Sequence, residues 1–199
     1  MADTQAARLE PAANRQESGR TDSTRGSRRG VILVLGGTGM LLPAVRHLLR
    51  ESEEVVVAAR RASRALSGVA GSVAAIDADW SHPAHYAELC LEAVAGREVR
   101  GVLLWVHQPH RDAVTQAIEP VLSQATRVVR LWGSASGDPR AKARASYRPS
   151  VGDLCEVYLG SVAGPDGRSW LTHEQISQGA LTALRGDCRE HAVGDLSVA

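Results

Sequence analysis

No run of apolar residues in this sequence is long enough to span a membrane, so we expect no membrane partner. Net charge is nearly absent as well: the formal value is +1 over 199 residues, which gives no global attraction for nucleic acid or an anionic surface. Cysteine is scarce, since only Cys90, Cys155 and Cys188 occur, and they lie far apart. This number and spacing match neither a disulfide framework nor a metal site, which favours reduced thiols and a cytoplasmic location.

The length and the 44% apolar content are enough for one domain with a sizeable core. Residues 1–29 show no hydrophobic periodicity and are rich in small and polar residues, so we expect a disordered arm. Arg28 and Arg29 before an apolar run also match part of a twin-arginine export signal. That run is short and stops at a glycine turn, which favours the start of a strand instead. We expect a folded domain over 30–185 and a flexible tail over 186–199.

The pattern at 31–42 organises the rest of the domain. A short apolar run at 31–35 predicts a strand buried on both faces. The residues at 36–39, Gly-Gly-Thr-Gly, then predict a sharp turn, and apolar residues recur at helical spacing from Met40 onward. Strand, glycine-rich turn and helix in this order are typical of the phosphate-binding start of a dinucleotide-binding fold.

In such a fold Gly36 permits the tight turn. Gly39 lets a pyrophosphate approach the first turn of the helix, where unpaired amides and the helix dipole favour an anion. The Thr38 hydroxyl adds a donor. The third glycine of the usual pattern is missing, because Leu42 stands there, so a glycine turn without a ligand is the alternative. We expect the cofactor to contact Gly36, Gly37, Thr38, Gly39, Met40 and Leu41.

Further apolar runs alternate with helical patterns along the chain. Strands are predicted at 54–59, 72–77, 101–106, 127–132 and 154–159, and helices at 83–95, 109–124 (interrupted at Pro120) and 172–184. The turn at 164–167 predicts a short strand at 168–171 that pairs back, and Thr172 to Gln175 form a capping box for the last helix. The fold class is therefore α/β: a Rossmann-type doubly wound parallel sheet of about six strands, with helices on both faces and a short extra C-terminal strand.

The end of the second predicted strand carries Arg60 and Arg61, and no carboxylate. In dinucleotide-binding folds a carboxylate there bonds the ribose 2′-hydroxyl, whereas an arginine accommodates a 2′-phosphate. These residues, with Arg64 one turn later, therefore favour NADP (NADPH) over NAD, unless they only solvate the start of a helix. After the third strand, Asp79 is expected near the adenine and Trp80 over its ring, although a tryptophan packed under a loop fits equally well.

The fourth predicted strand ends at Val106 and is followed at once by His107. Ligands of such folds bind at the strand ends where the strand order reverses. We therefore expect Val106 to contact the cofactor and His107 to meet the nicotinamide or a substrate. A histidine that merely caps the strand is the alternative.

The alternation of strands and helices headed by Gly-Gly-Thr-Gly at 36–39 resembles the short-chain dehydrogenase/reductase superfamily, in particular its small atypical members, over 31–184. The resemblance implies a catalytic serine after the fifth strand, then a tyrosine with a lysine four residues later. Ser134 matches the serine and Tyr147 the tyrosine, but Val151 stands where the lysine belongs. The tyrosine–lysine pair is therefore absent, although Lys142, the only lysine, could substitute from another loop.

These observations predict an NADP-dependent oxidoreductase that reduces a small carbonyl or imine, with His107, Ser134 and Tyr147 as candidate catalytic residues. Two alternatives stay open: an NAD(P)-binding sensor without catalysis, and a non-redox isomerase, cyclase or lyase that reuses the fold. Little chain follows the sixth strand, so we expect the loops after Val106 and Trp132 to form the substrate pocket, with 160–170 as a lid. We also expect a small-molecule substrate and a homodimer.

Overall fold

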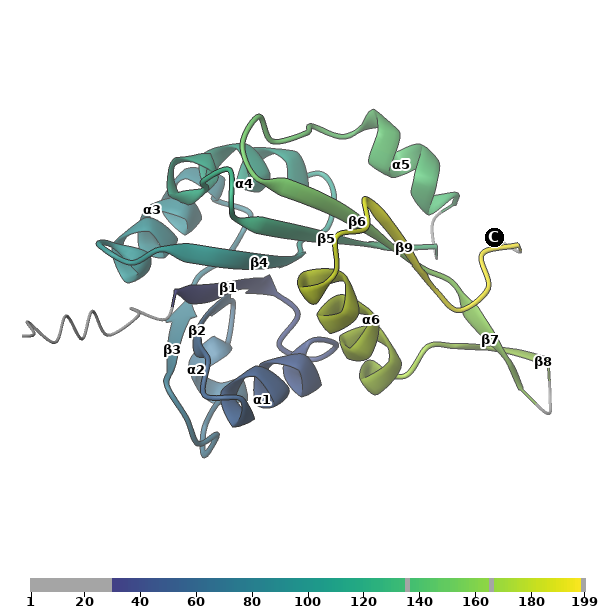
Figure 1. Ribbon diagram of the computed structural model, residues 1–199, viewed down its shortest axis with the longest axis horizontal. Helices are drawn as coiled ribbons and strands as arrows, with labels where there is room; N and C mark the ends of the chain where they lie inside the picture. Colours follow the sequence, from purple (N-terminus) through teal and green to yellow (C-terminus); the bar gives the residue numbers. More distant parts are fainter. Residues whose placement is uncertain (1–29, 135–136, 165–166, 198–199) are drawn as a thin grey trace, which may run out of the picture.

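The computed structural model describes residues 30–134, 137–164 and 167–197 (Figure 1). The predicted disordered arm at 1–29 lies outside these residues. Within the described ranges, no helix combines the length and apolar character needed to cross a membrane. No group of three or more His, Cys, Asp or Glu side chains there is arranged to hold a metal ion.

A seven-stranded sheet forms the centre of the molecule, and its neighbouring strands are parallel. The strand order is β3-β2-β1-β4-β5-β6-β9. These strands are β1 (Val31–Gly36), β2 (Glu54–Ala59), β3 (Val73–Asp77), β4 (Val99–Trp105), β5 (Arg127–Gly133), β6 (Asp153–Leu159) and β9 (Glu190–Val193). This arrangement confirms the predicted Rossmann-type doubly wound sheet.

Helices cover both faces of the sheet (Figure 1). On one face lie α1 (Leu42–Arg50) and α6 (His173–Arg185), and on the other lie α3 (Pro83–Val94) and α4 (Arg111–Ala117). The remaining short helices are α2 (Ala62–Ala65), η1 (Glu119–Val121) and α5 (Pro139–Ala145). The predicted interruption at Pro120 is confirmed, because α4 ends at Ala117 and Pro120 lies in η1. The predicted capping box is also present: the Thr172 hydroxyl accepts from the Gln175 amide, and the Gln175 side chain accepts from the Thr172 amide.

Strand β1 lies in the middle of the sheet, and its side chains divide between two hydrophobic clusters. Ile32 and Val34 pack with α1 and α6, whereas Leu33 and Leu35 pack with α3 and α4. Every residue of β1 is buried. A strand buried on both faces needs apolar residues at every position, which is why 31–35 reads as a continuous apolar run.

A hairpin outside the main sheet completes the architecture. Strands β7 (Ser161–Gly164) and β8 (Gly167–Trp170) pair antiparallel, which confirms that the chain pairs back after the turn at 164–167. The hairpin extends away from the body of the fold (Figure 1). At its base, Trp170 is 40% exposed although it is a large aromatic residue.

The predictions for the chain beyond 186 are wrong in one respect. Residues 186–199 are predicted to be a flexible tail, yet β9 pairs in parallel with β6 and adds a seventh strand. Its residues alternate between exposed and half-buried, and they include Glu190 and His191. An edge strand of this kind carries no apolar run, so the hydrophobic pattern does not reveal it.

Strand β9 also brings two cysteines together, because Cys188 precedes it and Cys155 lies on the neighbouring β6. Their Sγ atoms are 3.6 Å apart and both thiols are free. Burial raises the pKa of Cys155, and separately that of Cys90, to about 12. A thiol with such a pKa contains almost no thiolate at neutral pH and is a poor nucleophile.

We therefore predict that iodoacetamide labels neither Cys90 nor Cys155 in the native protein at pH 8, while both react fully in denaturant. The half-buried Cys188 reacts measurably in the native state and is the internal control. Peptide mass spectrometry after timed labelling measures each site. Equal native rates at all three positions would contradict the burial described here.

Candidate functional site

The strand order reverses between β1 and β4, and ligands of doubly wound folds bind at the carboxyl ends of the strands near such a point. In this structure two pockets lie there. One adjoins the ends of β1 and β2, and the other adjoins the ends of β4 and β5.

The glycine-rich turn after β1 depends on backbone angles that favour glycine. Gly36 has φ +77° and Gly37 has φ +70°. A Cβ atom on Gly36 would lie 2.3 Å from the Trp105 carbonyl oxygen and 2.9 Å from the Trp80 ring. The carbonyl oxygen cannot move away without displacing the backbone of β4. The turn therefore requires glycine at position 36.

The same turn presents backbone amides that have no acceptor. The amides of Thr38, Gly39 and Met40 form no hydrogen bond to any described part of the chain, and no side chain caps the start of α1. Unpaired amides at a helix N-terminus, together with the helix dipole, attract an anion. This is the cradle that the sequence predicts for a diphosphate.

Two neighbours hold this turn in place. The Ser177 hydroxyl on α6 donates to the Met40 carbonyl over 2.8 Å, which ties the turn to a helix far along the chain. Leu41 is fully buried, and its amide donates to the Gly37 carbonyl over 2.7 Å. Leu41, predicted as a cofactor contact, therefore has a structural role. Gly39 is exposed, and a Cβ there would meet only the His173 ring, at 3.8 Å.

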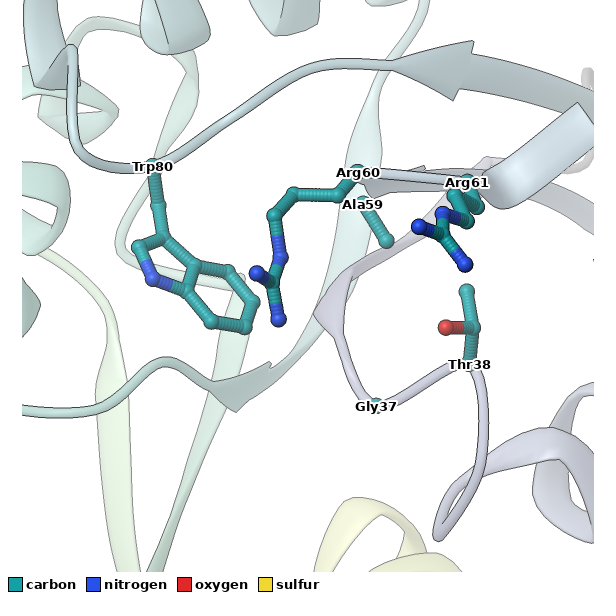
Figure 2. Close-up of a pocket in the computed structure, with 6 residues that line it drawn as sticks. All are labelled: Gly37, Thr38, Ala59, Arg60, Arg61 and Trp80. Atoms are coloured by element: carbon teal, nitrogen blue, oxygen red, sulfur yellow. The ribbon is translucent and has the colours of Figure 1, made fainter.

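The first pocket has a volume of about 310 Å³ and lies beside this turn (Figure 2). It is lined by Gly37, Thr38, Ala59, Arg60, Arg61 and Trp80. The Arg60 guanidinium lies 5.6 Å from the centre of the Trp80 ring. In Figure 2 the Arg61 side chain points toward Thr38 on the turn. Two cations and no carboxylate line the pocket, so it is suited to a ligand with negative charge and a flat ring.

Asp79 does not line this pocket. Its carboxylate accepts a hydrogen bond from the Ser81 amide over 3.0 Å, and this bond is the main reason that the pKa of Asp79 is lowered. The prediction that Asp79 meets an adenine gains no support from this position. The neighbouring Trp80 does line the pocket, and its contact with an adenine stays a prediction.

The second pocket has a volume of about 380 Å³ and is largely aromatic. Its lining comes from the glycine turn, the ends of β4 and β5, helices α4 and α5, and the hairpin: Met40, Trp105, His107, Gln108, Arg111, Trp132, Gly133, Lys142 and Trp170. The two pockets are neighbours, because the rings of Trp80 and His107 lie 6.1 Å apart. Residues after Val106 and Trp132 line this pocket, and Trp170 brings the hairpin to it. That the pocket binds a substrate stays a prediction.

His107 is exposed at the mouth of the second pocket and has its ring against Trp105, with ring centres 5.1 Å apart. Partial burial lowers the pKa of His107, and the positive charges of Arg111 and Arg60 lower it further. The imidazole is therefore neutral at pH 7 and can donate one N–H to a ligand. Val106, predicted as a cofactor contact, is fully buried and uses its carbonyl to accept from Arg111.

The two catalytic residues that the superfamily resemblance suggests lie outside the second pocket. Ser134 follows Gly133, which lines the pocket, but Ser134 itself does not. Tyr147 is near Glu119, whose carboxylate raises the pKa of the phenol. The backbone carbonyl of Tyr147 accepts a hydrogen bond from Arg130. Of the predicted catalytic residues, the structure brings only His107 to the pocket.

Arg111 is the pocket residue that the sequence analysis missed. It lies four positions after His107, in the first turn of a helix that follows a strand end, and this placement is a usable signal. The sequence did not indicate that Arg111 is buried, because charged residues are usually exposed. Gln108 and Trp170 lie in the segments that were expected to form the pocket and its lid, and both line it.

Solved structures with a similar architecture include short-chain dehydrogenases/reductases and a Rossmann-fold NAD(P)-binding family protein. A Rossmann-fold NAD(P)-binding family protein from Shigella flexneri superposes with a TM-score of 0.60 at 12% identity, over 85% of this chain and 95% of that one. The chain has the fold of the short-chain dehydrogenases/reductases. No protein-family model and no curated protein sequence matches it.

Two of the similar structures contain a nicotinamide cofactor. An alcohol dehydrogenase from Thermococcus sibiricus complexed with 5-hydroxy-NADP has a TM-score of 0.57 at 15% identity, over 85% of this chain and 97% of that one. A wide-type short-chain dehydrogenase/reductase from Veillonella parvula in complex with NADP has a TM-score of 0.56 at 13% identity, over 84% and 95%. At such identities the likeness establishes the fold alone.

Proposed function

We propose that this protein is an NADP-dependent oxidoreductase that reduces a small carbonyl or imine compound. The observation that carries the proposal is a cradle of unpaired amides beside a pocket lined by Arg60 and Arg61. The similar structures that hold NADP or its 5-hydroxy derivative support a nicotinamide cofactor for this fold.

The residues of the chain fit such a cofactor in three respects. The amides of 38–40 suit the diphosphate, and the two arginines suit a 2′-phosphate on the adenosine ribose. Trp80 offers a flat surface for an adenine. The second pocket adjoins the first through Trp80 and His107, so a long ligand reaches both.

NADPH, when bound, supplies a hydride, and the protein has to bind and orient the two reactants. The chain's own contribution is a pocket with three tryptophans in its lining, which orients the substrate. His107 holds a proton on a ring nitrogen at the mouth of that pocket and donates a hydrogen bond to the reacting oxygen or nitrogen. The neutral imidazole keeps this proton, and the proton that the product needs comes from solvent, which reaches the exposed His107.

The binding test compares the two coenzymes. Wild-type protein is expected to bind NADPH more tightly than NADH, as measured by calorimetry or nucleotide fluorescence. Replacing Arg61→Gln is expected to weaken NADPH binding about tenfold and leave NADH binding unchanged, because a hydrogen bond to a charged phosphate is lost.

Arg64→Gln is the matched control, because Arg64 is an exposed arginine of α2 that does not line the pocket. Its affinity for NADPH should equal that of wild type. Absence of binding to either coenzyme would reject the proposal.

A second candidate is an NADP-responsive binding protein without catalysis. The position of Tyr147 away from the pocket favours it, as does Val151 in place of the usual lysine. An assay of NADPH oxidation over a panel of small carbonyl and imine compounds separates the two. Tight binding with no turnover on the whole panel, and unequal affinities for NADP⁺ and NADPH, would favour the sensor.

A further inference from the structure

The walls of the second pocket combine flat apolar surfaces with positive charge. Trp105, Trp132 and Trp170 supply the apolar part. Arg111 and Lys142 supply the charge, and no carboxylate belongs to the described lining. Ligand pockets commonly pair apolar walls with a few polar groups that fix orientation. In this pocket those groups are suited to an anion.

Arg111 is the decisive residue because it is only 4% exposed and incompletely paired. Its Nε donates to the Val106 carbonyl over 2.6 Å, and its Nη2 donates to the Leu131 carbonyl over 2.9 Å. Its Nη1 is buried and has no hydrogen-bond partner within the described ranges. A buried donor on a charged group without an acceptor is costly. Because Arg111 lines the pocket, its positive charge favours a carboxylate there.

The acidic groups near Arg111 leave that nitrogen unsatisfied. Glu156 accepts two hydrogen bonds from Arg130 and a third from the Trp132 indole over 2.7 Å. Asp112 follows Arg111 in the chain, but its Oδ1 is likewise buried and has no hydrogen-bond partner among the described residues. Burial and the charge of Arg130 lower the pKa of Arg111 to about 10, so Arg111 is still a cation at pH 7.

Lys142 on α5 adds a second positive charge to the lining of the pocket. Its Nζ donates to the Gly133 carbonyl over 3.2 Å at the end of β5. Partial burial lowers the pKa of Lys142, and the positive charge of Arg111 lowers it further, which shows that the two cations repel each other. An anion between them would relieve this repulsion.

We propose that the second pocket binds a small organic acid with a flat apolar group, and that Arg111 and Lys142 hold its carboxylate. The apolar group lies against the tryptophan walls. This inference rests on the proposed function, since it names the substrate class of the same site: the reducible carbonyl or imine belongs to a carboxylic acid. His107 at the pocket mouth then meets the reacting group rather than the carboxylate.

The experiment uses pairs of probes that differ in charge but hardly in shape. Benzoate is compared with benzamide, and phenylacetate with phenylacetamide, by quenching of tryptophan fluorescence in the full-length protein, with and without NADPH. Each carboxylate is expected to bind about tenfold more tightly than its amide, which corresponds to a charge-assisted hydrogen bond.

Variants on one helix then assign the effect. Lys142→Gln is expected to remove most of the preference for the carboxylate. Arg144→Gln removes the same charge from the exposed side of α5 and is expected to preserve the preference. Arg111 also holds two backbone carbonyls, so its replacement disturbs the fold, and the test does not depend on it.

The outcomes separate this inference from the proposed function. If the protein prefers carboxylates and also binds NADPH, both this inference and the proposed function are supported. If it prefers carboxylates but does not bind NADPH, only the binding of an organic acid in the second pocket is supported. Equal affinities within every pair, no binding of any probe, or equal losses in the two variants would overturn the inference. A Lys142→Gln protein that loses affinity for NADPH but not for benzoate would also overturn it, because the anion held there would then be the coenzyme.

Discussion

Replacing Glu156→Ala is expected to lower the free energy of unfolding by about 3–5 kcal/mol, because it leaves the charge of Arg130 buried without a partner. Both side chains are nearly inaccessible: Arg130 is 0% exposed and Glu156 is 3% exposed. The substitution also removes the acceptor of the Trp132 indole N–H. Urea denaturation followed by tryptophan fluorescence measures the change.

Glu54→Ala is the matched control. Glu54 pairs with Arg97 over 3.4 Å, but both side chains are well exposed, at 41% and 36%. Solvent screens such a pair, and its loss is expected to cost less than about 1 kcal/mol. If the two variants were destabilised equally, the ion pair between β5 and β6 would not be buried as described.

Glu156→Ala should also lower the affinity of the second pocket for carboxylates. Arg111 stacks over the Trp132 ring, with its guanidinium carbon 3.7 Å from the ring centre. Trp132 is held by its bond to Glu156, so the loss of this carboxylate loosens one wall of the pocket. We expect a lower affinity for benzoate in any fraction of the variant that folds, with NADPH binding less affected because the first pocket is remote from β6.

The second large effect is expected at Gly36. An alanine there has to adopt φ +77°, and its Cβ would lie 2.3 Å from the Trp105 carbonyl oxygen. The left-handed backbone costs about 1–2 kcal/mol and the overpacking about 1–3 kcal/mol more. Gly36→Ala should therefore lose roughly 3 kcal/mol of stability and nearly all binding of NADPH, because the turn that carries the amides of 38–40 begins at this residue.

Gly39→Ala in the same turn separates stability from binding. Position 39 has no positive φ, and an added Cβ would meet only the His173 ring, at 3.8 Å. The variant should keep its thermal midpoint but bind NADPH less tightly, since the methyl group occupies space that the diphosphate would use. A Gly39→Ala protein with full affinity would show that the ligand does not approach the turn on this side.

Much of the fold could be predicted because parallel strands buried on both faces need continuous apolar runs. The run at 31–35 and the later runs leave little choice of secondary structure. The glycine turn could be predicted for a similar reason, because a sharp turn between a strand and a helix needs residues without side chains. The position of Arg60 and Arg61 follows directly from the end of β2.

Other features depend on contacts between distant parts of the chain. Strand β9 has no apolar run and gains its structure by pairing with β6, which then brings Cys188 against Cys155. Tyr147 stands at the usual sequence distance from Ser134, but Glu119 on η1 is the group it meets. Spacing along the chain could not reveal either partner.

The sequence by itself determined the parallel sheet, the glycine turn and the arginines beside it, because each depends on short-range pattern and backbone geometry. The tertiary structure alone decided the second pocket. Its tryptophans come from β4, β5 and β8, and its two cations come from α4 and α5. These elements meet only when the chain has folded. Arg111 is buried because they pack together, so its burial is a property of the tertiary structure.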